Sequence, residues 1–176
     1  MNFFPTIKSF SHTRFAWCLL FIIVILFQAM GLYFQHQLDL PPCVMCIYQR
    51  VALVGIGLAA LLGMLAPQKP IIFWPAMCVW GYSGVKGLLL TLEHIDYQFN
   101  PSPFATCDLF VTFPDWAPLN LWAPWLFEAY GDCSQVIWQF LTLSMPEWLA
   151  IIFTASLIAL GIVALAQCSN KSEPQS

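Results

Sequence analysis

The sequence predicts an all-α membrane protein, built as a four-helix transmembrane bundle with one large loop outside the bilayer. Hydrophobic residues make up 60% of the 176-residue chain and charged residues only 9%, and the mean hydropathy is +0.74. Soluble proteins carry about 25% charged residues. Four apolar runs are long enough to cross a bilayer, and a proline-broken, aromatic-rich segment separates the third from the fourth. The net charge of -3, without a basic cluster, argues against a nucleic-acid partner.

The first span is expected at about residues 15–35 of a single membrane domain that covers residues 1–176. No charged residue occurs from Phe15 to Leu38, and this run is longer than the apolar core of a cleaved signal peptide. No small-x-small cleavage site follows the run. We therefore expect an uncleaved anchor.

The second and third spans are expected at about residues 46–65 and 71–92, joined by a short polar turn. Two prolines precede the second span, where they suit the start of a helix. The small residues Gly55, Ala59 and Gly63 would let another helix approach the second span closely. The third span carries one charge, Lys86, which we expect to snorkel to the membrane surface or to pair with an acid.

Two loops are expected on the same side of the bundle, at about residues 36–45 and 93–147. The long segment has too many prolines for a span, yet it keeps tryptophans and phenylalanines, which favour the membrane–water boundary. We expect it to lie on the membrane surface with one or two short helices. Ser144 and Glu147 have the spacing of a capping box, which would open the fourth span at about residues 148–167.

The distribution of positive charges predicts the orientation of the bundle. The lysines and arginines of the short segments flank one side: Lys8, Arg14, Lys69 and Lys171. By the positive-inside rule both termini are then cytoplasmic. The loops that hold Cys43, Cys46, Cys107 and Cys133 face the other side. In a bacterium that side is the periplasm, where disulfides persist.

A Cys-x-x-Cys pair, Cys43 and Cys46, stands at the start of the second span, and Arg50 lies one turn further along the same face. The helix N-terminus and this permanent cation both favour a thiolate. Arg50 could also stabilise an anionic electron acceptor, or it could be an interfacial residue that snorkels. The spacing of the cysteines leaves four alternatives open: a redox pair, half of a zinc site, a structural disulfide and unpaired core thiols.

A second pair, Cys107 and Cys133, lies in the large loop. A disulfide between them would close about 26 residues and stabilise the fold by about 3 kcal/mol through loop-closure entropy. The alternative is a mobile disulfide that an outside thiolate can attack, and the spacing does not separate the two. The other cysteines are expected to act as small apolar residues: Cys18, Cys78 and Cys168.

Three further residues lie near the outer ends of the spans. His94 could hydrogen-bond a quinone carbonyl or donate a proton, or it could be an interfacial histidine bonded to water. Met145 is expected to make an apolar contact at the start of the fourth span, and His36 to be interfacial. Ile47 follows Cys46, so the haem attachment signature is missing, and the chain has no nucleotide-binding fingerprint.

Together these residues resemble the DsbB family of bacterial inner-membrane disulfide bond formation proteins. The resemblance covers nearly the whole chain, and its most specific parts are the two cysteine pairs with their Arg50 spacing and the run Pro-Ser-Pro-Phe-Ala-Thr-Cys at residues 101–107. It is carried by Trp17, Phe34-Gln35-His36, the segment 42–50, Glu93-His94, the segment 101–108, Gly131-Asp132-Cys133 and the segment 145–148.

The resemblance implies a quinone-dependent thiol oxidoreductase that reoxidises a DsbA-like periplasmic partner of thioredoxin fold. The partner's thiolate would attack Cys107 of a redox disulfide between Cys107 and Cys133. Exchange with a Cys43–Cys46 disulfide would then reoxidise the loop pair, and Cys46 would pass the electrons to ubiquinone or menaquinone in the membrane. No metal is implied. The residues implied to bind the quinone are Cys46, Arg50, His94 and Met145.

Other functions fit the same residues. A membrane metal-binding or structural protein would use Cys43, Cys46, His94 and Cys107 as ligands and keep its thiols reduced. A paralogue that serves one dedicated partner would look the same in sequence. A vitamin-K-reductase-like enzyme usually carries a second Cys-x-x-Cys late in a bundle helix, which this chain lacks.

Overall fold

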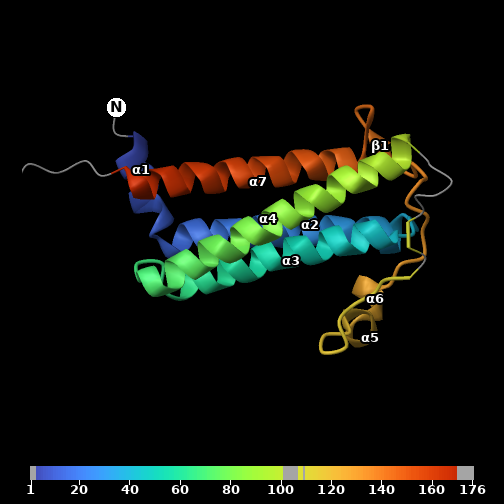
Figure 1. Cartoon of the computed structure of the whole chain (residues 1–176), viewed down its shortest axis with the longest axis horizontal. Coiled ribbons are helices and arrows are strands. Elements are labelled where there is room, and N and C mark those ends of the chain that lie inside the picture. Colours follow the sequence, from blue (N-terminus) through green and yellow to red (C-terminus); the bar gives the residue numbers. More distant parts are fainter. Residues whose placement is uncertain (1–2, 101–106, 109, 170–176) are drawn as a thin grey trace, which may run out of the picture.

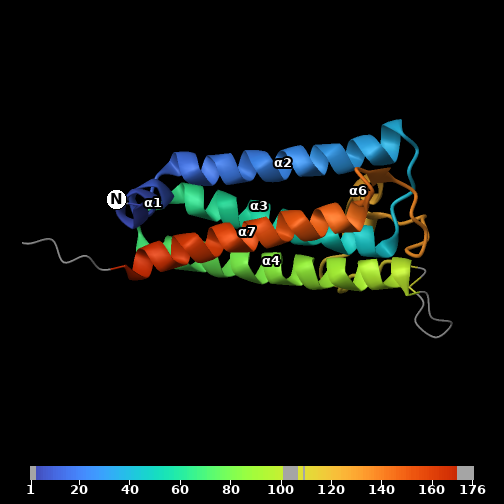
Figure 2. The same cartoon turned by 90° about the horizontal axis from the view of Figure 1, so that it is seen from above.

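A computed structural model describes residues 3–100, 107–108 and 110–169 of the chain. Four long helices lie side by side in a bundle (Figures 1 and 2): α2 (Arg14–Gln37), α3 (Val44–Leu65), α4 (Pro70–Phe99) and α7 (Met145–Cys168). Helix α3 packs against α2 and α4, and α4 packs against α7. The α3–α4 turn and the end of α7 lie beside the short helix α1 (Phe3–Ser11) at one end of the bundle, and the long connections lie at the other (Figure 1).

Three helices in the described part of the chain are long and apolar enough to cross a membrane: α2, α3 and α7. Helix α4 contains residues 71–92, where the third span is predicted, and it has the necessary length. It is less apolar than the other three because glycines, Ser83 and Lys86 interrupt its hydrophobic residues. The predicted helical membrane protein is therefore confirmed, and the span at residues 71–92 stays a prediction.

The helix boundaries differ from the predicted spans at two places. Helix α4 continues through Phe99, whereas residues 93–99 were expected in the large loop. Polar residues such as Glu93 and Asp96 end the apolar run, but they do not end the helix, which stops at Asn100. No helix was predicted before the first span, but Phe3–Ser11 form the helix α1, which carries exposed phenylalanines.

The connection between α4 and α7 is mostly irregular, as expected. Its described part holds two one-turn helices, α5 (Leu119–Trp122) and α6 (Pro124–Phe127). A hairpin of two short antiparallel strands, β1 (Gln139–Phe140) and β2 (Leu143–Ser144), was not predicted. The capping box of Ser144 and Glu147 is confirmed at the start of α7, where the Ser144 N–H donates to Glu147 Oε2 at 2.6 Å.

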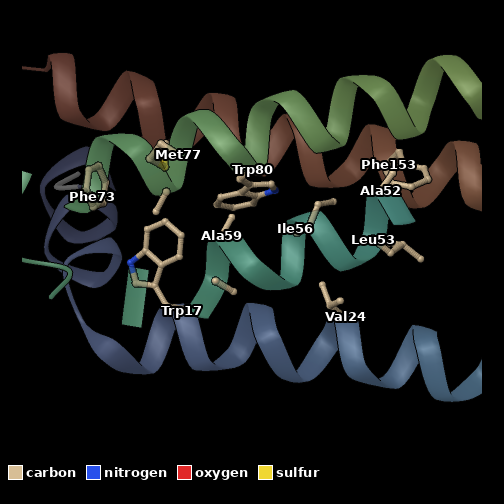
Figure 3. Close-up of a cluster of buried hydrophobic side chains, with 12 residues drawn as sticks. Trp17, Val24, Ala52, Leu53, Ile56, Ala59, Phe73, Met77, Trp80 and Phe153 are labelled. Atoms are coloured by element: carbon tan, nitrogen blue, oxygen red, sulfur yellow. The ribbon is translucent and has the colours of Figure 1, made fainter. Parts of the chain in front are cut away.

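The predicted row of small residues brings the helices together. A Cβ atom on Gly55 would lie 2.3 Å from Ser83 Oγ of α4, and one on Gly63 would lie 2.1 Å from the Trp17 ring of α2. Ala59 between them is completely buried. Figure 3 shows Trp17 in the resulting core with Ala59 and residues of α4 around it. The row thus gives α3 its central place in the bundle.

Candidate active site

Cys43 and Cys46 lie at the start of α3, where Cys43 is the N-cap residue. The Cys46 N–H donates to Cys43 Sγ at 3.4 Å, which holds the first turn of the helix in place. The two sulfurs are 2.9 Å apart and are free thiols in this structure, so the Cys43–Cys46 disulfide stays a prediction. The hydrogen bond with Cys46 and the burial of Cys43 both raise the pKa of the Cys43 thiol. The Cys43 thiol is therefore harder to deprotonate than an ordinary cysteine.

His94 of α4 lies against Cys43, with its Nε2 atom 3.5 Å from Cys43 Sγ. Gln49 Nε2 donates to His94 Nδ1 at 3.3 Å, so we assign the imidazole proton to Nε2, which faces the sulfur. His94 is 3% exposed and lies beyond the predicted end of the third span. Burial lowers its pKa to about 4, although the Cys133 backbone opposes this shift. The imidazole is therefore neutral at neutral pH.

Arg50 is held inside the bundle and does not reach toward the membrane surface. It is 8% exposed, and its Nη1 atom donates to Gln35 Oε1 at 2.8 Å and to the Leu126 carbonyl at 2.6 Å. Gln28 donates to the Arg50 carbonyl at 2.9 Å. The snorkelling alternative for Arg50 is therefore wrong, because neighbouring polar groups satisfy the guanidinium in place of headgroups or water.

A cavity of about 390 Å³ lies between α2, α3, α7 and the β1–β2 hairpin. Cys46, Arg50 and Met145 line it, and His94 does not. Most of the other lining residues are apolar or aromatic, among them Phe27, Met30, Phe34, Leu53, Trp138, Phe140, Trp148 and Ile152. The volume falls within the range of about 300–1,000 Å³ that is usual for small-molecule sites. The cavity suits a flat apolar ring with a polar edge toward Arg50.

Aromatic contacts fix the outer wall of this cavity. Phe34 and Trp138 have ring centroids 5.1 Å apart, and Trp138 stacks on Phe140 at 6.2 Å. Trp148 completes the row at 6.1 Å from Phe140, and its Nε1–H donates to the Phe140 carbonyl at 3.1 Å. The unpredicted hairpin thus supplies one side of the cavity.

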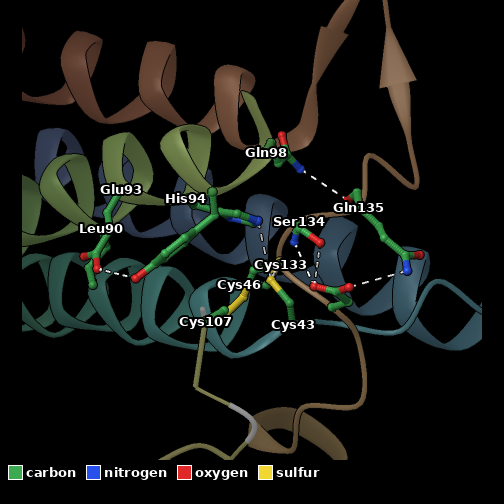
Figure 4. The surroundings of a disulfide bond; sticks show 12 residues. Cys43, Cys46, Leu90, Glu93, His94, Gln98, Cys107, Cys133, Ser134 and Gln135 are labelled. Atoms are coloured by element: carbon green, nitrogen blue, oxygen red, sulfur yellow. Dashed lines mark hydrogen bonds between the residues drawn. A yellow bond between two sulfur atoms is a disulfide. The ribbon is translucent and has the colours of Figure 1, made fainter. Parts of the chain in front are cut away.

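Cys107 and Cys133 are joined by a disulfide in the structure. Cys133 is 1% exposed and packs with Cys43 and Met45 in a small buried cluster, whereas Cys107 is partly exposed at its margin. Figure 4 shows the four cysteines gathered in one place, with His94 reaching them from α4. The residues 101–106 of the proline-rich motif lie outside the described part of the chain.

The segment that carries Cys133 is fixed to the start of α3 by backbone hydrogen bonds. The N–H groups of Tyr130 and Gly131 donate to the Pro42 carbonyl at 2.9 and 3.0 Å. Asp132 Oδ1 accepts hydrogen bonds from the Ser134 backbone N–H and hydroxyl, both at 2.9 Å. The bond from the Ser134 backbone keeps the pKa of Asp132 below its ordinary value.

The remaining polar residues have simpler surroundings. Lys86 lies on the exposed side of α4, and no ion pair with it is found among the residues that the structure describes. His36 Nε2 lies 3.1 Å from the Trp125 carbonyl. Gln35 also donates to this carbonyl, at 3.2 Å. The side chains of α2 thus hold the α6 segment beside Arg50.

Three residues of the site had no role in the sequence-based hypotheses: Gln35, Gln49 and Gly131. Each stands in a motif that carries the resemblance. The glutamines could have been noticed as polar residues in or beside predicted spans, where polar side chains need partners. Gly131 has no such signal, because its importance depends on a contact with a distant segment.

Comparisons with known proteins give a consistent result. The family model described as "Disulfide bond formation protein DsbB" matches residues 13–163. The chain is 60% identical to the Disulfide bond formation protein B of Vibrio vulnificus over 167 residues, 95% of this chain and 97% of the relative. It is 59% identical to the protein of that name in Vibrio cholerae over 172 residues, 98% of this chain and 99% of the relative. The corresponding Aliivibrio fischeri protein is 61% identical over 165 residues, 94% and 98% of the two chains.

Proposed function

Because this chain belongs to the DsbB family of disulfide bond formation proteins, we propose that it is a thiol oxidoreductase that reoxidises a DsbA-like dithiol oxidase and passes the electrons to a membrane quinone. One observation carries this proposal. The two cysteine pairs meet at one end of the bundle. Cys46 of the inner pair, which is Cys43 and Cys46, lines an apolar cavity there together with Arg50.

The loop pair is the entry point for the partner's electrons in this proposal. A partner thiolate attacks one sulfur of the Cys107–Cys133 disulfide and forms a mixed disulfide with it. Attack requires access, and Cys107 is partly exposed whereas Cys133 is 1% exposed. This difference supports Cys107 as the attacked sulfur. The loop pair is then reoxidised by exchange with Cys43–Cys46.

The inner pair delivers the electrons to the cavity. A bound quinone, ubiquinone or menaquinone, supplies a two-electron acceptor there. Cys46 and Arg50 line the cavity, and the permanent charge of Arg50 stabilises a thiolate on Cys46 as well as negative charge inside the cavity. The walls are mostly apolar, and apolar surroundings strengthen both effects.

Arg50 can perform this role only if its guanidinium stays in place. Gln35 Oε1 and the Leu126 carbonyl each accept a hydrogen bond from Nη1. Gly31 lies beside Nη2, since a Cβ atom there would come within 3.3 Å of it. Gly31 and Arg50 both line the cavity, so the side of the guanidinium that bears Nη2 is the side available to a ligand. His94 lies outside this cavity, and its Nε2–H faces the Cys43 sulfur, to which it can donate a hydrogen bond.

The proposed location is the bacterial inner membrane, with four spans and both termini in the cytoplasm. The four redox cysteines would then face the periplasm. The three membrane-capable helices and the family support a membrane protein. The positive charges around Lys8, Arg14 and Lys69 support the orientation.

The test uses purified protein in detergent without oxygen. Reduced DsbA-like partner and a soluble ubiquinone or menaquinone analogue are added, and quinone absorbance is followed. We expect rapid reduction that is lost in Cys46→Ser and at least about tenfold slower in Arg50→Ala. Cys78→Ser is the matched control, because Cys78 is a free thiol exposed on α4. No reduction of either quinone analogue would overturn the proposal.

One observation favours metal binding as a second candidate function. The ligand atoms of Cys43, Cys46 and His94 lie within 4.8 Å of one another, a separation that suits a zinc ion with three protein ligands. Cys107, the fourth expected ligand, is bonded to Cys133 instead. The metal hypothesis predicts about one zinc per purified chain and thiols that stay reduced in the presence of quinone. Elemental analysis of the same preparation separates the two functions.

A further inference from the structure

Gly131 makes a close backbone contact between the large loop and the residues that lead into α3. It forms a parallel bridge with Cys43, and its N–H and that of Tyr130 both donate to the Pro42 carbonyl. Two donors on one carbonyl hold this part of the loop against residues 41–43. The contact is therefore made by the backbone and does not depend on long side chains.

No other residue type fits at this position without a shift of the loop. A Cβ atom on Gly131 would lie 2.4 Å from the Pro41 carbonyl oxygen, 3.1 Å from the Pro41 carbonyl carbon and 3.3 Å from the Cys43 nitrogen. All three are backbone atoms, so none can rotate away as a side chain would. The proline rings at positions 41 and 42 restrict the backbone further.

The consequence reaches Cys133, two residues further along the loop. The turn at Asp132, closed by its hydrogen bonds with Ser134, leads the chain from Gly131 into the buried cluster. There Cys133 packs with Cys43 (Figure 4), and both residues are buried. Gly131 thus determines how close the Cys133 segment comes to Cys43.

We propose that Gly131 is a positioning residue that docks Cys133 against Cys43 for the exchange between the two cysteine pairs. The inference rests on the proposed function and adds to it the residue that positions the two sulfurs. A partner that bonds to Cys107 releases Cys133 as a thiolate, and this thiolate attacks Cys43. The Cys133–Cys43 bond forms as the Cys43–Cys46 bond breaks, and the electron pair leaves on Cys46, the sulfur that lines the cavity.

The test measures bond formation between the Cys43 and Cys133 sulfurs without the rest of the reaction. Cys46 and Cys107 are replaced by serine, and the purified protein is equilibrated with glutathione buffers of different redox ratio. Alkylation and mass spectrometry give the fraction of protein with a Cys43–Cys133 disulfide. Its dependence on the glutathione ratio gives the effective concentration of the Cys133 thiol at Cys43. This measurement needs neither quinone nor partner, so it stays readable if the proposed function fails.

Gly131→Ala is expected to lower this effective concentration at least tenfold, since a misplacement of about 1 Å can cost a reaction about a hundredfold. Gly161→Ala in α7 is the matched control and should change nothing, because a Cβ atom there meets no atom within 4 Å. Asp132→Ala, at an exposed position, should give a smaller fall of about fivefold through the loss of the turn.

Two further outcomes decide the inference. An effective concentration in Gly131→Ala equal to that of the parent protein would overturn it. So would an equal fall in Gly131→Ala and Gly161→Ala, because that result would mean a general loss of structure.

In the protein with all cysteines, Gly131→Ala should leave reduction of the Cys107–Cys133 disulfide by dithiothreitol unchanged while quinone reduction by the reduced partner slows at least tenfold.

Discussion

The buried His94 predicts a pH dependence of stability with a definite sign. Burial lowers the pKa of His94 to about 4, whereas an ordinary histidine titrates near 6.5. Between these two values the unfolded chain binds a proton at His94 that the folded chain does not. The stability contributed by the neutral imidazole is therefore complete above pH 6.5 and is lost as the pH falls toward 4. One pKa unit corresponds to about 1.4 kcal/mol, so the full loss is on the order of 3 kcal/mol.

The assay compares the free energy of unfolding at pH 7.5 and pH 4.5 in the parent protein and in His94→Gln. Glutamine keeps a polar side chain at the position but does not titrate. The parent should lose about 2–3 kcal/mol more than the variant over this interval. His36→Gln is the matched control, because His36 is exposed, and it should behave as the parent does. Equal losses in the parent and His94→Gln would refute the assignment of a neutral, buried imidazole.

Three further predictions follow from close contacts in the bundle. Gly63→Val should destabilise the fold by about 1–3 kcal/mol, measured by unfolding in detergent, because its side chain would overlap the Trp17 ring. Gly31→Leu should raise the quinone KM at least tenfold by filling the space beside Arg50 Nη2, with loop disulfide reduction unchanged. Gln35→Leu should slow quinone reduction about tenfold, because the guanidinium loses one of its two hydrogen-bonded partners. A Gln35→Leu rate equal to that of the parent would contradict this role.

The helices were predictable because each long helix has a simple signal. Apolar runs located α2, α3 and α7, and the spacing of Ser144 and Glu147 gave the start of α7 correctly. The end of α4 was missed because the polar residues after position 92 end a membrane span without ending a helix. The β1–β2 hairpin was missed because its strands have only two residues each, too few for an alternating pattern.

The candidate site was predictable in its thiols and less so in its surroundings. The Cys-x-x-Cys spacing at a helix start is a local pattern, and it placed Cys43, Cys46 and Arg50 correctly relative to one another. The contact of His94 with Cys43 depends on how α4 packs beside α3, which no local pattern encodes. The same holds for Gln35, whose partner Arg50 lies on another helix.

The attachment of α6 to α2 divides the ring closed by Cys107 and Cys133 into two arms of unequal length. The Trp125 and Leu126 carbonyls are bonded to His36, Gln35 and Arg50, so the ring is pinned there. The arm from residue 127 to Cys133 has seven residues and spans at most about 25 Å when fully extended. The arm that leads to Cys107 is more than twice as long. Tyr48 of α3 attaches the long arm a second time, because the Thr112 N–H donates to the Tyr48 hydroxyl at 3.0 Å. Cys107 lies five residues from this attachment and Cys133 two residues from Gly131, so each sulfur stays close to the bundle when the disulfide opens.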